Sequence, residues 1–312
     1  MRSMIRGFVG LVFVSITPAL AQPHLLAVLG GNAVQADDAG AVVEIDPATG
    51  AATPLATPIP GESLTGIAVL PDGRVYVCTA DISGPAQLIE VDAQTGALLN
   101  VVGPLSDGVA PVVFHDLAAD PTTGVLYGIS IGDEAVAEGA GSVNAFFTLD
   151  PATALATYVA TPAPLNGGFM AIAFSNDGTL WGKVTNSPEL YELDKSTGAV
   201  LSTVTLAPSV GGIGLGNAGD DTFYMAECCA GVPGNILYRV DRLTGAATLI
   251  GSAGGNRRVH DFVIAEGLPP IVEIPTLGGR GLLLLATALL AAGYLLLGRR
   301  RALSTAPRRP AG

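Results

Sequence analysis

The sequence is poor in charged and aromatic residues and has few cysteines. Charged residues make up 13% of the 312 positions and aromatic residues 5%, and 27 acidic residues outnumber 15 basic ones. A chain with so little positive charge lacks the basic face that nucleic-acid binding needs, so we expect no nucleic-acid partner. Three cysteines exclude a disulfide framework, and their spacing does not form a zinc site. Apolar residues are abundant (49%), which excludes a disordered chain.

The first 21 residues have the pattern of a secretory signal peptide. Arg2 and Arg6 precede an apolar run at 8–14, and a small-x-small triplet follows at 19–21. The run is too short to cross a bilayer. We therefore predict a signal peptide at 1–21 and export of the rest of the chain.

A second apolar run lies close to the C-terminal end. Residues 281–298 form an uncharged run of eighteen residues, enough to span a membrane core. Three arginines follow directly at 299–301, and basic residues after an apolar span favour a cytoplasmic end. We expect a transmembrane helix at 281–298, a basic cytoplasmic tail at 299–312 and an ectodomain at the cell surface.

The portion between the two runs is strongly acidic. All 27 acidic residues and only seven basic ones lie between positions 22 and 274, which gives this portion a net charge of −20. Such a surface is soluble, repels anionic lipid and nucleic acid, and tolerates divalent cations or a cationic partner.

A phrase of the form apolar-x-apolar-Asp, followed by a turn with Thr-Gly, recurs through residues 22–270. Its aspartates stand 44 to 58 residues apart: Asp46, Asp92, Asp150, Asp194 and Asp241. The third copy has Ala154 in place of the glycine, so we expect another turn type or backbone strain there. One carboxylate per turn is too few for a calcium loop, and we interpret these turns as structural.

A second phrase lies between the copies of the first one. It is an apolar run, a turn of the Asp-Gly or Thr-Gly kind and another apolar run, at 66–78, 116–130, 171–184 and 212–226. Asp-Gly between apolar runs is a strong hairpin signal. Two hairpins in each period make four strands, which is typical of a β-propeller blade.

The two ends of this region predict how the propeller closes. A strand at 259–265 has no second strand after it, and a strand at 25–31 has no first strand before it. Together they complete a blade in which the C-terminal end supplies the innermost strand, which removes the free sheet edges. We predict an all-β fold, a five-bladed β-propeller at 22–270, followed by a linker at 271–280.

Long loops on one face are the expected place for a binding site. In an up-and-down blade, the first and third turns lie on one face, and the second turn and the connection to the next blade lie on the other. Function concentrates in long loops on a rigid scaffold. The loops of the second face carry acidic residues that form a solvated rim or bind a cation or basic partner: Asp37, Asp38, Asp81, Asp133, Glu134, Glu138 and Glu227.

Two His-Asp pairs, His115-Asp116 and His260-Asp261, occupy the same position in their repeats. This position is near the channel mouth, where histidine and carboxylate could bind a divalent metal or act as acid and base. Consecutive residues of a strand point opposite ways, and the two histidines stand two blades apart, which favours local hydrogen bonds or packing between blades instead. The other blades have Thr65, Met170 and Gly212 at the histidine position.

Cys228 and Cys229 are adjacent, and a bridge from either of them to Cys78 would cross a whole blade. A vicinal disulfide or free thiols remain, and export favours oxidation. We interpret a disulfide here as a structural clip.

The C-terminal end resembles the IPTL-CTERM sorting signal of bacteria, which is similar to PEP-CTERM. The matching residues are Ile274, Pro275, Thr276, Leu277, Gly281, Arg299, Arg300 and Arg301, while Gly278 and Arg280 differ from the usual pattern. The resemblance implies an exosortase-type processing enzyme as a partner, with cleavage near Pro275; without it, the same residues make a simple membrane anchor. The ectodomain loosely resembles bacterial surface propellers of the YVTN or NHL-like kind.

These features favour a binding or structural module over an enzyme. The sequence has no nucleophile elbow, P-loop, metalloprotease helix or dinucleotide-binding fingerprint, and we assign no catalytic residue and no cofactor apart from an optional divalent cation. The partner of the loop face would be a protein or a glycan. The alternative is a metal-dependent hydrolase of the lactonase kind with its site at the channel mouth.

Overall fold

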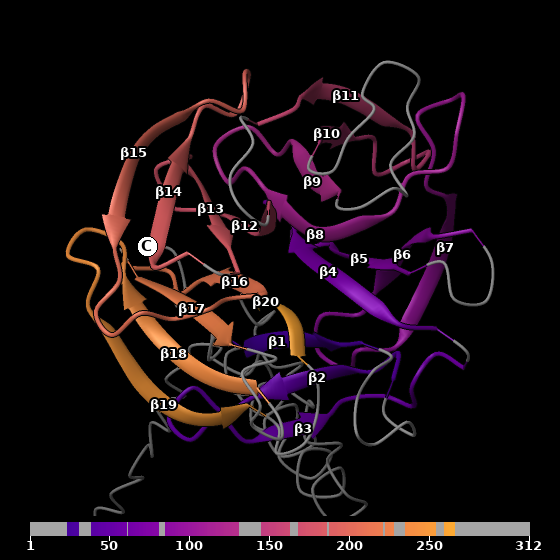
Figure 1. The fold of residues 1–312 in the computed structure, drawn as a ribbon. Helices are drawn as coiled ribbons and strands as arrows, with labels where there is room; N and C mark the ends of the chain where they lie inside the picture. The colour runs from indigo at the N-terminus through magenta and orange to yellow at the C-terminus, as the bar shows by residue number, and fades with distance from the viewer. Residues whose placement is uncertain are drawn as a thin grey trace, which may run out of the picture. The chain divides into compact units, whose positions relative to one another are not determined.

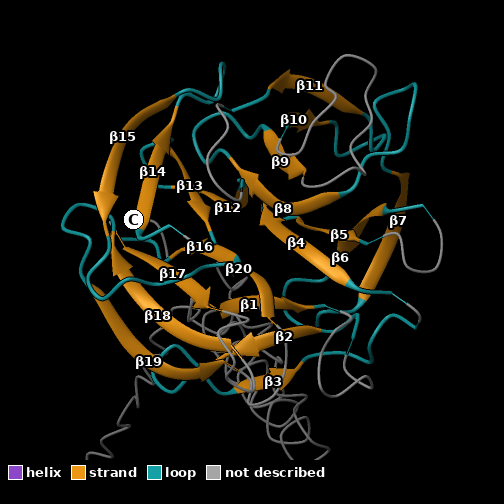
Figure 2. Ribbon diagram, viewed as in Figure 1, coloured by secondary structure: helices purple, strands orange, loops and turns teal. Residues whose placement is uncertain are grey.

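The computed structural model describes residues 24–30, 39–60, 62–80, 85–130, 145–162, 168–185, 187–220, 222–227, 235–253 and 259–265. All of them belong to one compact unit, residues 21–267. Within the described ranges the chain forms twenty strands and no helix, so the predicted all-β fold is confirmed (Figure 2).

The strands form five antiparallel sheets of four strands, the blades of a propeller. Blade 1 contains β20 (Val259–Ala265), β1 (His24–Leu29), β2 (Val42–Ile45) and β3 (Ala52–Pro54). Blade 2 contains β4 (Leu64–Val69), β5 (Val75–Thr79), β6 (Gln87–Val91) and β7 (Leu98–Pro104). Blade 3 contains β8 (Phe114–Ala119), β9 (Leu126–Ser130), β10 (Phe146–Leu149) and β11 (Ala156–Ala160). Blade 4 contains β12 (Phe169–Phe174), β13 (Leu180–Val184), β14 (Glu189–Leu193) and β15 (Val200–Thr205). Blade 5 contains β16 (Gly214–Asn217), β17 (Thr222–Glu227), β18 (Asn235–Asp241) and β19 (Ala247–Ala253).

The blades form a closed ring around the innermost strands (Figure 1). Strand β4 contacts β8, β8 contacts β12, β12 contacts β16, β16 contacts β20 and β20 contacts β4. Strand β20 pairs antiparallel with β1, with Phe262 opposite Ala27. The predicted closure of blade 1 by both ends of the propeller is therefore confirmed, and so is the count of five blades.

The repeated Asp turns have the predicted capping role. In the first copy, Asp46 accepts hydrogen bonds from Ala48 N (2.8 Å) and Thr49 Oγ1 (2.8 Å), and Gly50 has a φ of +76°. Ala154 keeps the same turn with a φ of +59°, and it is the one non-glycine residue of the described ranges with a positive φ. The third copy thus has strain in an unchanged turn type, because an alanine Cβ is crowded in the left-handed region.

The hydrophobic core is divided into five clusters, and each cluster lies between two adjacent blades. The cluster between blades 2 and 3, for example, contains Tyr76, Leu88, Phe114 and Phe147. Phe114 and Phe147 pack edge to face with ring centroids 5.5 Å apart. Because every blade contributes to two clusters, the apolar face of each sheet is buried on both sides.

The predicted signal peptide (1–21), linker (271–280), transmembrane helix (281–298) and tail (299–312) lie outside the described residues. Among the described residues, no helix is long and apolar enough to span a membrane.

Candidate functional site

Two buried aspartates from blades 1 and 3 form the centre of the site. Asp116 of β8 accepts hydrogen bonds from Leu117 N of its own strand (2.8 Å) and from Ile172 N of β12 (2.7 Å). Its carboxyl group is also hydrogen-bonded to that of Asp261 in β20. Neither residue has solvent-exposed area.

Asp261 connects the remaining blades to this centre through hydrogen bonds. Its oxygens accept hydrogen bonds from Phe262 N of its own strand (2.7 Å), Ile67 N of β4 (2.8 Å) and Leu215 N of β16. The innermost strands of all five blades therefore donate an amide to one of two carboxyl groups. The site lies at the axis of the ring, where these five strands meet.

Burial raises the pKa of both carboxyl groups, because a charged carboxylate loses its hydration in the interior. The pKa of Asp116 is raised well above its usual range, first by burial and then by the neighbouring charge of Asp261. Burial raises the pKa of Asp261 to about 7, against the opposing effect of its hydrogen bonds with Asp116 and the backbone. The hydrogen bond between the two carboxyl groups also needs a proton on one of them, so the raised pKa values agree with the geometry.

Small residues in the other three blades leave room for the two carboxyl groups. Gly66, Ala171 and Gly214 precede the amide donors of blades 2, 4 and 5, the position that aspartate occupies in blades 1 and 3. A Cβ on Gly66 would lie 2.6 Å from Leu117 N, and a Cβ on Gly214 would nearly overlap His260 O. The strands can approach the axis this closely only because these positions lack large side chains.

The two histidines meet on the loop side of the aspartates. The pairing of β8 with β9 skips His115 and that of β20 with β1 skips His260, which marks a β-bulge at each. Their ring centroids are 5.6 Å apart, and His115 Nδ1 lies 2.6 Å from Met170 O. A bulge redirects its side chain, so the strict alternation expected from the sequence does not hold here. In blade 5 the pairing places Ile213, and not Gly212, at the histidine position.

The structure thus brings together the four residues predicted as metal ligands: His115, Asp116, His260 and Asp261. The carboxyl oxygens, however, already accept hydrogen bonds from backbone amides. In the part of the chain that the structure describes, no group of three or more histidine, cysteine, aspartate or glutamate side chains is arranged to hold a metal ion. The divalent-cation site stays a prediction.

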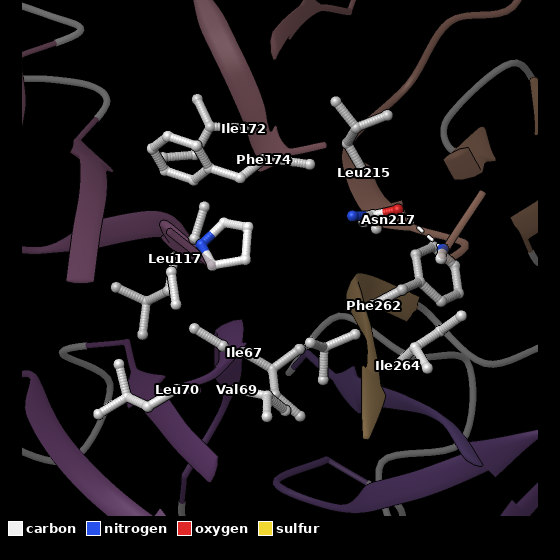
Figure 3. A pocket seen from close by; sticks show the side chains of 18 of the residues that line it. Ile67, Val69, Leu70, Leu117, Ile172, Phe174, Leu215, Asn217, Phe262 and Ile264 are labelled. Carbon is white, nitrogen blue, oxygen red and sulfur yellow. Dashed lines mark hydrogen bonds between the residues drawn. The ribbon is translucent and has the colours of Figure 1, made fainter. Parts of the chain in front are cut away.

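On the opposite side of the aspartates, the channel widens into a cavity of about 420 Å³ with walls from all five blades (Figure 3). Its deepest ring is formed by the residues whose amides bind the two aspartates, and each of them is at most 2% exposed: Ile67, Leu117, Ile172, Leu215 and Phe262. The carboxyl pair therefore lies directly behind the floor of the cavity.

The outer part of the cavity is apolar, with two amide side chains at one edge. Its walls include Val69, Phe174 and Ile264. Asn217 Nδ2 donates to Asn176 Oδ1 (2.8 Å), and Asn176 Nδ2 donates to Gly219 O (2.7 Å). No charged side chain is among the described residues that line the cavity. Its mouth is formed by first-turn residues of the blades: Pro71, Gly73, Pro121, Asn176 and Gly219.

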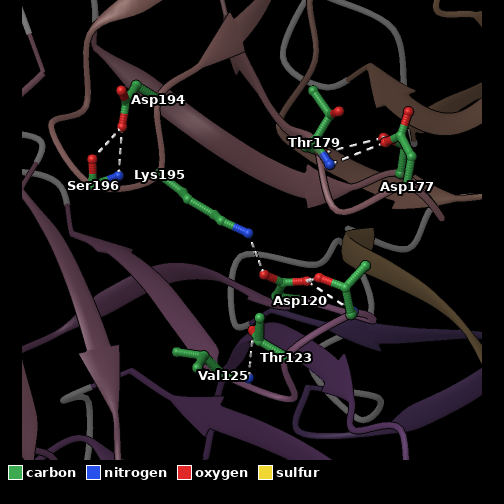
Figure 4. A network of polar contacts seen from close by, with 10 residues as sticks. Asp120, Thr123, Val125, Asp177, Thr179, Asp194, Lys195 and Ser196 are labelled. Carbon is green, nitrogen blue, oxygen red and sulfur yellow. Dashed lines mark hydrogen bonds and ion pairs between the residues drawn. The ribbon is translucent and has the colours of Figure 1, made fainter.

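Ion pairs between neighbouring blades hold the turns around this mouth. Lys195 Nζ lies 2.6 Å from Asp120 Oδ2, which links the third turn of blade 4 to the first turn of blade 3 (Figure 4). Burial favours the neutral form of Asp120, but hydrogen bonds from Lys195 and Thr122 outweigh it and lower the pKa of Asp120 to about 2. Arg242 links blades 5 and 4 in the same way, 3.1 Å from Asp177.

On the loop face, six of the seven predicted acidic residues lie outside the described ranges. Glu227 is described, and its Oε1 accepts a hydrogen bond from Gly211 N (3.3 Å). Nearby, the fully buried Lys183 donates to Val184 O (2.7 Å) and Ser187 O (2.5 Å). Burial lowers the pKa of Lys183 to about 8, and the charge of Glu227 opposes this. The two carbonyl bonds give Lys183 a structural role.

Of the three cysteines, Cys78 lies in the described part of the chain. It is a buried free thiol, 3.2 Å from Thr65 Oγ1, and burial raises its pKa to about 12. A thiol with so high a pKa is unreactive at neutral pH. Cys228 and Cys229 lie outside the described residues, so the vicinal disulfide stays a prediction.

The sequence did not predict this cavity, because the long loops placed the expected site on the opposite face. A signal was available in the innermost strands. They alternate small and large residues from one position to the next, as in Gly66-Ile67-Ala68 of β4 and Ala171-Ile172-Ala173 of β12. The small residues allow close contact with the next blade, and the large ones line the cavity.

Comparison with known proteins shows likeness in structure alone. No family model matches the chain, and no curated protein matches it. The chain is similar in structure to hydrazine synthase of Kuenenia stuttgartiensis (17% identity, TM-score 0.37), covering 65% of this chain and spanning half the length of that one. It is also similar to a chain of a nidogen/laminin complex (12%, TM-score 0.47, 78% of this chain and 98% of that one). The PQQ-bound aldose sugar dehydrogenase of Streptomyces coelicolor matches at 17% identity and a TM-score of 0.41, covering 78% of this chain and 82% of the enzyme.

Proposed function

We propose that the protein is an exported β-propeller, anchored at the cell surface through its IPTL-like C-terminal end, and that it acts as a binding module. The observation that carries the binding role is the channel cavity of about 420 Å³ enclosed by all five blades. Its volume is in the range of small-molecule sites, which are mostly apolar and largely preformed. The signal-peptide pattern and the IPTL-like segment support the location.

The geometry of the aspartates supports binding over catalysis. A general acid or base needs a lone pair or proton within reach of a substrate. Asp116 and Asp261 are fully buried, and their oxygens accept hydrogen bonds from backbone amides. The pair therefore joins the blades and does not face the cavity.

The alternative function, a metal-dependent hydrolase, has one observation in its favour. His115 and His260 lie next to each other on the loop side of the channel, with ring centroids 5.6 Å apart. Two imidazoles could supply part of a zinc site, which needs at least three protein ligands for catalysis. The further ligands would come from the loops of that face.

Metal titration distinguishes the two functions. Purified residues 22–267 form a closed ring with its own core, so they are suitable for calorimetry with Zn²⁺ and Ca²⁺. We expect no stoichiometric binding that depends on the two histidines. A one-to-one complex that the double variant His115→Ala/His260→Ala loses, while it stays folded, would favour the hydrolase.

Cell fractionation tests the location. The full-length chain is expected in the membrane or surface fraction, accessible to external protease, and a chain that ends at residue 270 is expected to be released. Retention of the full-length chain in the cytoplasm would overturn the proposed anchoring without affecting the cavity.

A further inference from the structure

We propose that the channel cavity binds a compact, uncharged, largely apolar molecule of about 17 non-hydrogen atoms, a size scaled from the cavity of about 150 Å³ that holds benzene. The inference rests on the proposed binding function and names the class of ligand for it. Three features carry it: the side chains of the wall, the lack of charge partners and the carboxyl pair behind the floor.

The wall selects for apolar surface. Four of the five innermost strands place an apolar side chain on the cavity at their last or second-last residue, among them Val69, Phe174 and Ile264 (Figure 3). A flat or aromatic ligand body would bury most of its surface against them, and burial of apolar surface is the main source of affinity in such a site.

Among the described residues, the cavity offers no partner for a charged ligand group. The described residues of its lining include no charged side chain. Its two amide side chains, Asn176 and Asn217, already hydrogen-bond to each other and to Gly219. A charged group would lose its hydration on entry and gain no ion pair in return, which is strongly unfavourable.

The floor adds a specific bias against anions. Asp116 and Asp261 lie behind the deepest ring, and their amide donors Ile67 and Leu117 are part of that ring. Charge on this buried pair is weakly screened, so a carboxylate or sulfonate in the cavity is repelled. A cation is attracted by the pair but cannot touch it, because the ring residues intervene.

Two dyes that differ by one charge test this selection. N-phenyl-1-naphthylamine is uncharged and has about 17 non-hydrogen atoms, and 1-anilinonaphthalene-8-sulfonate is the same molecule with a sulfonate added. Both become fluorescent in apolar sites. Residues 22–267 are expected to bind one equivalent of the uncharged dye with a dissociation constant of about 10–100 μM. The dissociation constant of the sulfonate should be at least about tenfold higher.

A cavity-filling variant shows where the dye binds. Val69→Trp places a large side chain in the cavity, and Val101→Trp makes the same change on the exposed surface of β7. We expect Val69→Trp to weaken binding of the uncharged dye at least about tenfold and Val101→Trp to leave it unchanged. Ala119→Leu, a smaller change on the same wall, serves if Val69→Trp does not fold.

The outcomes are distinct. Equal affinity for both dyes overturns the selection against charge, and binding that neither Val69→Trp nor Ala119→Leu weakens overturns the location. No binding of the uncharged dye to the folded ring overturns the ligand class. Cell fractionation is independent of all three results, so the anchoring and the ligand class can fail separately.

Discussion

Asp116 and Asp261 have the most unusual environment of any residues in the described structure. Two carboxyl groups without solvent exposure would repel each other if both were charged. A hydrogen bond between the two carboxyl groups and amide donors from all five innermost strands offset this cost. A pair of acidic residues thus links the five innermost strands at the centre of the ring.

The raised pKa values make stability depend on pH in a predictable direction. A carboxyl group whose pKa is raised on folding contributes stability that is complete below its unfolded pKa and is lost as the pH rises through the folded pKa. For Asp261 the unfolded pKa is about 4 and the folded pKa is about 7, so the free energy of unfolding should fall between about pH 4 and about pH 7. Above pH 8 the lowered pKa of Lys183 acts in the opposite direction, so stability should rise again there.

Asp116→Asn should weaken this pH dependence. The variant loses one backbone hydrogen bond, which costs about 1–3 kcal/mol, but it also removes a carboxyl group whose own pKa is raised well above its usual range. In urea unfolding, the stability gap between the natural chain and the variant should therefore narrow by about 1 kcal/mol per pH unit from pH 5 to pH 7. A constant gap would show that folding does not raise the pKa of Asp116.

At the residue level, the sequence drew attention to the two His-Asp pairs but did not predict that they contact each other. The repeat register identified both His-Asp pairs and suggested local hydrogen bonds for them. It could not show that residues two blades apart touch, because that depends on how closely the innermost strands approach the axis. It also could not show the β-bulges at His115 and His260, which depend on pairing with the next strand.

The strands and turns followed the sequence closely. Hairpins with Asp-Gly turns and the capped Asp-x-x-Thr-Gly turns formed where the two phrases predicted them, because both depend on short-range chemistry. Ala154 shows how strongly the surrounding strands determine the turn: it keeps a positive φ without glycine. The long loops of the opposite face contain no such short-range sequence signal.

Gly66 of β4 should be intolerant of any side chain. An alanine Cβ there would lie 2.6 Å from Leu117 N, and backbone of the next blade cannot move aside as a side chain can. We expect Gly66→Ala to lower the free energy of unfolding by about 2–3 kcal/mol. Thermal or urea unfolding measures the change.

Gly73→Ala is the matched control for Gly66→Ala. Gly73 has a φ of +87°, but no atom lies within 4 Å of an added Cβ, so the change costs the backbone strain of about 1 kcal/mol and no clash. Equal losses for the two variants would contradict the close approach of β4 and β8 at the axis.

At the level of the whole molecule, the ring is closed by strands from its two ends. Strand β20 pairs with β1, contacts β4 and β16, and carries Asp261. The sequence predicted this closure because two unpartnered strands remained at the ends of the repeat. The cavity could not be predicted in the same way, because its volume depends on the packing of five strands at once.

A chain that ends at residue 253 should therefore not form a stable monomer. Removal of β20 exposes one edge of β1, leaves the amides of Ile67 and Leu215 without their carboxyl acceptor and opens the core between blades 1 and 5. A synthetic peptide of residues 256–267 added in trans should restore the far-ultraviolet spectrum and a cooperative unfolding transition. A truncated chain that unfolds cooperatively without the peptide would contradict this role.

Two buried carboxyl groups at the axis should hold the five blades together. A carbon-13 NMR titration of the aspartate carboxyl groups in residues 22–267 tests this directly. Asp116→Asn and Asp261→Asn assign the two signals. We predict one carboxyl group that titrates near pH 7 and a partner that stays protonated well above the usual aspartate range, both with chemical shifts that respond to the two steps. Two independent titrations near pH 4 would place both side chains in water and contradict the account.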